Sequence, residues 1–548
     1  MKIVVIGGVA AGASAATKAR RVNENAEIII LEKGPYVSFA NCGLPYYVGG
    51  DIKKKDNLLL VTPELFKKRF RIEVRLHHEV VAIDAKEKTI TVQSPENSYK
   101  EQYDKLIIAT GAEPVKPSLP GIDLPQVFTV STVPDAESIV EHLAAGAQSA
   151  VVVGGGFIGL ETAEALLQKG VNTTLIQRSQ QLAKNFDVEF SRPLERHLQE
   201  LGCKLVFGQS LSKIIGEEKV EAVELTDGRQ LPTDLVIMAV GVRPRVQLAQ
   251  IAGLQIGQSG GILVNAAMQT SDPFIYAAGD VVESLHLVSG RKVRIPLAGS
   301  ANKQGRVAGA NAAGGKLLFK GVLGTAIIKV GKLTIARTGL SEKEAQEAGK
   351  DYFVSYSPLN SHASYYPGAQ GMIIKLVAEN FTGRLLGAQI IGSLGVDKRI
   401  DVLATAIYAG LSVFDLENLD LAYAPPYGAA KDPVIMSGMI AANIVRGEIK
   451  QVTPQQLEEL KKQAGIVVLD VRAREEFAKE AIEGAVNIPV DELRSRYEEI
   501  DPEKTILIYC RSGYRSYLAS RFLQQKGYKV FNVSGGFLAY KMDVQVKK

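Results

Sequence analysis

Cys42 stands where a thiol could do redox chemistry. It lies in the run Ser38–Tyr47 (SFANCGLPYY), a Gly- and Pro-flanked loop that begins a predicted helix, whose N-terminal amides would stabilise a thiolate. A dithiol mechanism needs a second cysteine a few residues away, but the next is Cys203. A redox-active Cys42 must therefore take its disulfide partner from outside this segment, so we expect a mixed disulfide or persulfide. The alternative is a buried structural cysteine.

Cys510 is a second candidate thiol, placed between the predicted strand 505–509 and a predicted helix 517–525. Arg511 and Arg515 lie close to it in sequence and should favour its thiolate form. The turn's backbone amides would form a nest for an anion. The spacing Cys-x4-Arg is one residue shorter than the Cys-x5-Arg loop of phosphatases. The smaller loop favours a sulfane sulfur over a phosphate. Cys203 is assigned no function.

Two segments of the chain resemble each other in sequence. Each is a short β-branched strand, residues 2–6 and 150–153, that feeds a glycine turn and a helix. Second strands follow at 26–31 and 172–176. This is the start of a dinucleotide-binding unit, present twice, and it suggests two nucleotides held face to face. The glycines that carry it are Gly7, Gly8 and Gly12 in the first turn and Gly154, Gly156 and Gly159 in the second.

The residues after each second strand bear on ribose recognition. Glu32 stands 20 residues after Gly12, where a carboxylate accepts hydrogen bonds from ribose hydroxyls. Val9 replaces the second glycine of the usual fingerprint. The second unit has Gln177 and Arg178 instead of an acid, and an arginine there accommodates a 2′-phosphate. We therefore expect NADPH to be favoured, with NADH not excluded.

Length and composition limit the number of domains and the classes of partner and compartment. A chain of 548 residues suggests three or four domains, and its net charge of +5 is too small to argue for nucleic acid or an anionic membrane as partner. No apolar stretch reaches 18 residues, and glycines interrupt the N-terminal apolar run, so neither a membrane span nor an export signal is expected. Three cysteines cannot form a disulfide framework. We expect a cytoplasmic protein and assign no metal site.

Three segments together resemble the two-dinucleotide-binding flavoprotein disulfide reductases. They are the first glycine turn, the run Ala109, Thr110 and Gly111, and the segment that ends at Gly279 and Asp280. The resemblance implies that the first unit binds FAD, with Asp280 on the ribityl chain, and that the second binds NAD(P)H.

The run around Cys42 resembles the coenzyme A-disulfide reductases, whose single cysteine forms a mixed disulfide with coenzyme A. Related NADH peroxidases and oxidases carry a histidine in the first glycine turn, where this chain has Val9, Ala10 and Ala11. The resemblance also implies that Tyr365 and Tyr423 reach the cysteine of the other subunit of a homodimer, where a phenol could protonate a departing thiolate.

Coenzyme A carries several phosphates, so its site needs cations. By resemblance, the binding residues are Ser14, Lys18, Arg21, Ser38, Asn41, Lys303 and Lys431. The basic residues of the first helix fit a solvated helix face equally well.

The tail resembles a rhodanese, a sulfurtransferase domain. The resemblance rests on the segments 469–472 and 484–489 as well as on the Cys510 loop. It implies that Cys510 carries a persulfide, that Arg511 and Arg515 contact substrate, and that Asp470 and Arg472 are mainly structural.

The sequence thus predicts an α/β chain with two Rossmann-like domains, an α+β dimerisation domain and an α/β rhodanese domain. The predicted ranges are 1–113 with 244–320 for FAD, 114–243 for NAD(P)H, 321–447 for dimerisation and 452–548 for the rhodanese. The predicted activity is NAD(P)H-dependent reduction of coenzyme A persulfide, polysulfide or coenzyme A disulfide. Two alternatives stay open: an NADH oxidase or peroxidase, and a sulfur-trafficking or redox-sensing protein with slow turnover. The preferred acceptor, and direct sulfur exchange between Cys42 and Cys510, are undecided at this point.

Overall fold

The computed structural model describes residues 1–543. The last five residues of the predicted range 452–548 lie outside the described residues. The chain folds into two compact units, the first formed by Met1–Leu182 and Leu198–Gly324 and the second by Ala183–His197 and the chain from Thr325 onward. Within residues 1–543, no helix is both long and apolar enough to cross a bilayer.

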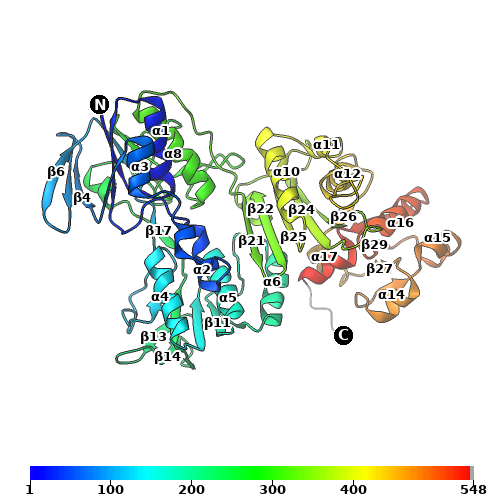
Figure 1. Ribbon diagram of the computed structural model, residues 1–548. Coiled ribbons are helices and arrows are strands. Elements are labelled where there is room, and N and C mark those ends of the chain that lie inside the picture. The colour runs from blue at the N-terminus through cyan, green and yellow to red at the C-terminus, as the bar shows by residue number, and fades with distance from the viewer. Residues whose placement is uncertain (544–548) are drawn as a thin grey trace. The chain divides into compact units, whose positions relative to one another are not determined.

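A parallel five-stranded sheet is the core of the first nucleotide-binding domain (Figure 1). Its order is β18-β7-β1-β2-β3, and all of its strands except the edge strand β3 are largely buried, as is typical of a parallel sheet. The strands are β1 (Lys2–Ile6), β2 (Glu27–Glu32), β3 (Glu73–Leu76), β7 (Lys105–Ile108) and β18 (Ile275–Ala277). Helix α1 (Ala10–Val22) joins β1 to β2 and packs against α8 (Ala298–Ala312). The carboxyl ends of these strands therefore carry the first glycine turn, Glu32 and Asp280 at one edge.

Smaller elements of this domain surround that sheet. An antiparallel three-stranded sheet has the order β4-β5-β6, and Cys42 lies in the 3-10 helix η1, just before α2. The elements are η1 (Asn41–Gly43), α2 (Leu44–Gly49), η2 (Lys55–Leu58), α3 (Pro63–Phe70), β4 (Glu79–Asp84), β5 (Thr89–Gln93), β6 (Ser98–Gln102), α7 (Gln247–Ile251), β19 (Ser284–Leu285) and β20 (Lys292–Val293).

The second nucleotide-binding domain repeats the plan. Its parallel sheet has the order β12-β11-β10-β16-β9, and an antiparallel sheet β13-β14-β15 packs beside it. The elements are β9 (Val127–Phe128), α4 (Val133–Ala144), β10 (Ser149–Val153), α5 (Phe157–Gln168), β11 (Asn172–Gln177), β12 (Lys204–Phe207), β13 (Leu211–Ile215), β14 (Ala222–Leu225), β15 (Gln230–Pro232) and β16 (Leu235–Met238). The antiparallel pair β8 (Ala112–Pro114) and β17 (Val242–Pro244) connects the two domains. Helix α5 packs against α2 and so comes close to the Cys42 loop.

The second unit contains an antiparallel sheet of order β21-β22-β25-β24-β23, with α10 packed on it (Figure 1). Its elements are β21 (Ala326–Val330), β22 (Leu333–Gly339), α9 (Glu342–Glu347), β23 (Tyr352–Asn360), β24 (Gly371–Glu379), β25 (Leu385–Gly392), α10 (Val396–Ala409), α11 (Val413–Leu416) and α12 (Pro433–Val445). The segment Ala183–His197, which includes most of α6 (Val188–Glu200), also belongs to this unit.

The tail domain is a parallel sheet of order β26-β30-β29-β27-β28 with helices around it. Its elements are β26 (Gln451–Val452), α13 (Pro454–Leu460), β27 (Ile466–Asp470), α14 (Arg474–Lys479), β28 (Val486–Asn487), α15 (Val490–Arg496), η3 (Tyr497–Glu499), β29 (Thr505–Tyr509), α16 (Tyr514–Gln525), β30 (Lys529–Val533) and α17 (Gly536–Asp543). Helix α16 begins three residues earlier than predicted, so Cys510 lies in a short loop directly before the helix.

Candidate active site

The first glycine turn leaves no room for side chains. Gly7 has φ +94°, and a Cβ there would lie 2.4 Å from the carbonyl oxygen of Ala109. A Cβ on Gly12 would lie 1.8 Å from the oxygen of Gly7. Glu32 accepts hydrogen bonds from the backbone N–H groups of Gly8 at 2.8 Å and Gly34 at 2.9 Å. Since a carboxylate has about four acceptor sites, Glu32 can hold the turn and still accept from ribose hydroxyls.

Two further groups at this edge fit a hydroxyl- and phosphate-bearing ligand such as FAD. Asp280 follows β18, and among residues 1–543 its carboxylate has no hydrogen-bond partner; partial burial raises its pKa, with Arg294 acting in the opposite direction. Arg294 donates through Nη2 to the carbonyl of Val242 at 3.2 Å, while its Nε and Nη1 atoms are buried without a partner. The Thr110 side chain is not free for a ligand in the same way. Its hydroxyl donates to the backbone oxygen of Arg245 at 2.9 Å and stabilises the Ala109–Gly111 turn.

The second turn has the same geometry with a neutral acceptor. A Cβ on Gly154 would lie 2.3 Å from the oxygen of Ala239, and one on Gly159 would lie 1.9 Å from the oxygen of Gly154, whereas Gly156 faces open space. Gln177 takes the place of Glu32, because its Oε1 accepts from the N–H of Gly155 at 3.0 Å. Arg178 is exposed and forms no ion pair within the described residues. A free guanidinium at this position suits a 2′-phosphate.

The surroundings of Cys42 oppose its ionisation. Its side chain reaches the surface, but partial burial raises its pKa, and the carboxylates of Glu161 and Asp280 add to the effect. The expected stabilisation of a thiolate by helix amides is outweighed, because α2 is only six residues long and negative charges face the sulfur.

Glu161 and Tyr46 form a proton-carrying pair next to Cys42. The Tyr46 hydroxyl donates to Glu161 Oε1 at 3.2 Å. Burial raises the pKa of Glu161 to about 7, with the nearby charge of Glu164 contributing. Burial and the charge of Glu161 raise the pKa of Tyr46 to about 12. At neutral pH Tyr46 therefore stays protonated, while Glu161 exists in both forms.

Most of the residues assigned to coenzyme A from the first unit gather around α1. Ser14 donates to Asn302 Oδ1 of α8 at 2.7 Å, which brings Lys303 of α8 near the same face. Lys18, Arg21 and Lys303 form no ion pair among residues 1–543. Asn41 donates to the backbone oxygen of Ser131 at 3.3 Å.

Ser38 has a different place from the others. It is buried with φ +49°, and its backbone pairs with Gly8 and Leu60, which holds the Cys42 loop against the first turn.

The two predicted tyrosines come together in the second unit. The hydroxyls of Tyr365 and Tyr423 lie 2.8 Å apart, and the side chains are 74% and 47% exposed. Their hydrogen bond raises the pKa of Tyr423. Lys431, also assigned to coenzyme A, is exposed and forms no ion pair in the described part of the chain. An exposed phenol pair is available to protonate a leaving thiolate on another molecule.

The Cys510 loop surrounds a buried sulfur that accepts one backbone and one side-chain hydrogen bond. Cys510 Sγ accepts from the N–H of Gly513 at 3.1 Å and from the hydroxyl of Ser516 at 3.4 Å. Arg511 is exposed and unpaired within residues 1–543. Arg515 forms a two-pronged ion pair with Glu476, at 2.6 and 2.9 Å. Arg472 pairs with the buried Asp470 at 2.6 Å, as expected for a structural ion pair.

Family comparisons cover nearly the whole chain. The model for pyridine nucleotide-disulphide oxidoreductases matches residues 1–305, and the model for the dimerisation domain of the same enzymes matches residues 325–432. The chain belongs to the pyridine nucleotide-disulphide oxidoreductase family. A rhodanese-like domain matches residues 453–543. The predicted resemblance and α/β fold class of this oxidoreductase are therefore confirmed.

Individual proteins resemble this oxidoreductase closely. An NAD(P)H coenzyme A polysulfide/persulfide reductase of Pyrococcus horikoshii is 40% identical over 437 residues, which are 79% of this chain and 97% of the relative. The structure of reduced Bacillus anthracis CoADR-RHD superposes with a TM-score of 0.96 at 44% identity, covering 99% of this chain and 98% of that one. An NAD-dependent persulfide reductase from A. fulgidus has a TM-score of 0.92 at 42% identity, covering 98% and 100%.

Two residues of the candidate site, Glu161 and Arg294, were not predicted from the sequence. Glu161 comes two residues after Gly159, and a carboxylate on the otherwise apolar start of α5 was the available signal. Arg294 lies in an irregular stretch between β20 and α8, where no motif marks it. Both were found only because the fold brings them to Cys42 and Asp280.

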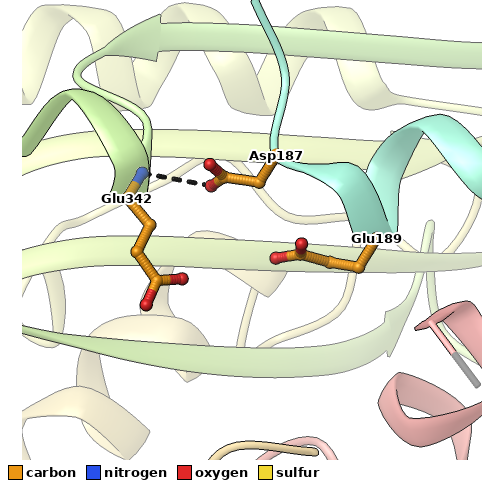
Figure 2. A group of neighbouring side chains, drawn as sticks. All are labelled: Asp187, Glu189 and Glu342. Atoms are coloured by element: carbon orange, nitrogen blue, oxygen red, sulfur yellow. Dashed lines mark hydrogen bonds between the residues drawn. The ribbon is translucent and has the colours of Figure 1, made fainter. Parts of the chain in front are cut away.

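One carboxylate cluster in the described residues has the spacing of a metal site. Asp187, Glu189 and Glu342 offer oxygens within 4.8 Å of one another, and Figure 2 shows the three carboxylates converging. The Nζ of Lys375 fills the space between them, at 2.8 Å from Asp187 and 2.6 Å from each glutamate. Although burial opposes ionisation, this ammonium lowers the pKa of Asp187. The cluster is an ion-pair network rather than an open ligand set.

Proposed function

We propose that this oxidoreductase uses NAD(P)H and FAD to reduce coenzyme A persulfide, polysulfide or coenzyme A disulfide at Cys42, and that its rhodanese domain exchanges sulfane sulfur through Cys510. The observation that carries the proposal is a cysteine near Asp280 of the proposed flavin site without a second cysteine nearby, in a chain that also holds Cys510 in a loop whose N–H group donates to its sulfur. The activities for which the relatives from P. horikoshii and A. fulgidus are named support the persulfide substrate.

FAD is proposed for the first domain, where Glu32, Asp280 and Arg294 would hold its ribose, ribityl and polar groups. When bound, the flavin supplies the two-electron transfer between nicotinamide and sulfur. The nicotinamide nucleotide belongs in the second domain. Gln177 and Arg178 support use of NADPH as well as NADH, since a neutral amide and a free guanidinium tolerate the 2′-phosphate.

Cys42 acts as the nucleophile. Its thiolate attacks the inner sulfur of the persulfide R–S–SH, the sulfur–sulfur bond breaks, and hydrosulfide leaves. The product is a mixed disulfide between Cys42 and coenzyme A. Two electrons from NAD(P)H then cleave that disulfide, so that one NAD(P)H yields one free thiol and one hydrosulfide. The cationic face of α1 with Lys303 would hold the phosphates of coenzyme A.

The exposed pair Tyr365 and Tyr423 serves as proton donor to the departing coenzyme A thiolate. The match to a dimerisation domain and the exposure of both phenols support a homodimer in which the pair of one copy serves Cys42 of the other. The cytoplasm is the proposed compartment, because all three cysteines are free thiols.

Anaerobic oxidation of NADH and NADPH with a panel of acceptors tests the proposal. We expect the fastest turnover with coenzyme A persulfide, one sulfide released per nucleotide oxidised, and activity with both nucleotides. The first turn lacks a histidine, so hydrogen peroxide and oxygen should be poor acceptors. Rapid turnover with peroxide or oxygen and none with persulfide would favour the oxidase or peroxidase alternative. Slow turnover with every acceptor would favour sulfur trafficking.

A further inference from the structure

A groove runs between α15 and α16 of the rhodanese domain and shares Arg515 with the Cys510 site described above. The groove has a volume of about 480 Å³. Its apolar floor includes Leu493, Ala519 and Phe522. Helix α16 contributes one face of the groove, because positions 515, 518, 522 and 525 repeat at helical spacing.

The polar lining of the groove is mainly cationic. Arg494, Arg515 and Arg521 line it, and Asp491 is its one carboxylate among the described lining residues. Arg494 lies over the ring of Phe522, 5.3 Å from its centroid, and forms no ion pair in the described chain. Arg521 donates only to neutral oxygens, the carbonyl of Glu448 and the side chain of Gln524. These two guanidinium groups therefore carry charge that no carboxylate in the described chain pairs with.

The groove leads toward the reactive sulfur. Arg515 lines it, and Ser516, the next residue of α16, donates to Cys510 Sγ at 3.4 Å. Arg521 lies six residues further along α16, about 9 Å down the helix axis at ~1.5 Å per residue. An anionic group near Arg494 and Arg521 would thus sit well away from the sulfur.

We propose that this groove holds the phosphate groups of a long-armed thiol, of the chemical class of coenzyme A, while its sulfur exchanges sulfane sulfur with Cys510. A thiol with a short arm cannot reach both places, whereas a flexible arm of pantetheine type can. The apolar floor suits the arm, and the free guanidinium groups suit phosphate oxygens.

The reaction at Cys510 is a sulfur transfer without net oxidation. The acceptor thiolate attacks the outer sulfur of the Cys510 persulfide, the sulfur–sulfur bond breaks, and the Cys510 thiolate leaves. The acceptor becomes a persulfide. This inference rests on the proposed function, because that persulfide is the substrate proposed for Cys42.

Sulfur transfer by the full chain from thiosulfate to three acceptors, without NAD(P)H, tests the groove. The acceptors are coenzyme A, pantetheine with the same arm but no phosphate, and cyanide with no arm. In a double variant Arg494→Gln and Arg521→Gln, kcat/KM for coenzyme A should fall about tenfold, as for losing charge-assisted contacts at a partly exposed site. Pantetheine and cyanide should change by less than about twofold, a difference within ordinary surface effects.

The matched control is Arg496→Gln on α15, the helix that also carries Arg494. The Arg496 guanidinium pairs with Glu492 and Glu499 and does not line the groove. This replacement should leave all three acceptors unchanged. An unchanged rate with coenzyme A in the double variant, or an equal loss with all three acceptors, would overturn the groove assignment. Wild-type protein that transfers sulfur to none of them would overturn the sulfurtransferase function itself, and with it the groove.

Discussion

At the residue scale, burial first and then the charges around Cys42 raise the pKa of its thiol. Glu161 and Asp280 both raise the pKa of Cys42, and Glu161 itself titrates at a pKa of about 7. The charge that faces Cys42 therefore changes within the physiological pH range. Below pH 7 a mostly neutral Glu161 disfavours the thiolate less, and above it the carboxylate disfavours the thiolate more. Glu161 is thus a positioning residue for the ionisation of Cys42.

Replacement Glu161→Gln should shift the ionisation of Cys42 to lower pH. Glutamine keeps the acceptor for the Tyr46 hydroxyl but removes the negative charge, so the pKa of Cys42 should fall. The measurement is the pH dependence of alkylation of Cys42 in the NAD(P)H-reduced protein, followed by peptide mass spectrometry. Buried Cys203, whose pKa burial raises to about 11, serves as internal control. An alkylation midpoint unchanged from wild type would contradict the role given to Glu161.

The limits of the sequence at this scale have a physical origin. The positions of Glu32 and Gln177 were predictable, because their distance in sequence from the glycine turns is typical of this motif. Each side chain accepts a hydrogen bond from a backbone N–H group of its own glycine turn. Glu161 was not, because its effect on Cys42 depends on the packing of α5 against α2 from another domain. The direction of the pKa shift at Cys42 was not predictable for the same reason, since its main cause, burial, and the opposing carboxylates of Glu161 and Asp280 depend on distant segments.

At the element scale, one buried lysine ties α6 to the sheet of the second unit. Lys375 of β24 bonds Asp187 and Glu189 at the start of α6 and Glu342 of α9. The Tyr356 hydroxyl donates to Glu189 at 2.6 Å, and its backbone N–H donates to Ser534 of the rhodanese domain at 2.9 Å. The network therefore joins three parts of the second unit.

Replacement Lys375→Met should destabilise the second unit by about 3–5 kcal/mol, because it leaves buried carboxylates without their cation. The measurement is the urea midpoint of unfolding. Lys329→Met on the exposed face of β21 is the matched control and should change stability by less than about 0.5 kcal/mol. Adding Asp187→Asn to Lys375→Met should recover part of the loss. If Lys375→Met unfolds at the wild-type midpoint, the network does not hold these elements together.

Elements marked by a local sequence pattern were predictable from the sequence. Elements whose position depends on contacts with residues far away in the sequence were not. Both glycine turns and the strands beside them follow from β-branched runs and glycine spacing. Residues 183–197 belong to the second unit, and Asp187 forms a hydrogen bond and an ion pair there with residues more than 150 positions away, which no local pattern encodes. Helix α16 starts before its predicted first residue because Tyr514 to Ser516 follow a left-handed Gly513 that already ends the loop.

At the scale of the whole molecule, the proposed activities would place production and consumption of one intermediate in a single chain. Cys510 would transfer sulfane sulfur to a phosphate-bearing thiol, and Cys42 would reduce the resulting persulfide. The chain shares both the reductase and the rhodanese parts with the B. anthracis structure, over 99% of its length. A single polypeptide therefore contains both thiols in equal number, which suits a substrate that passes between them.

The central claim is that Cys42 is the sulfur nucleophile of the reductase. Its most direct test is the rate of sulfide release from coenzyme A persulfide, with NAD(P)H under anaerobic conditions, in wild type and in Cys42→Ser. The account predicts a loss of about 10³-fold or more in the variant, as for removal of a nucleophile, with sulfur transfer from thiosulfate to cyanide unchanged. A Cys42→Ser protein that releases sulfide at the wild-type rate would contradict it.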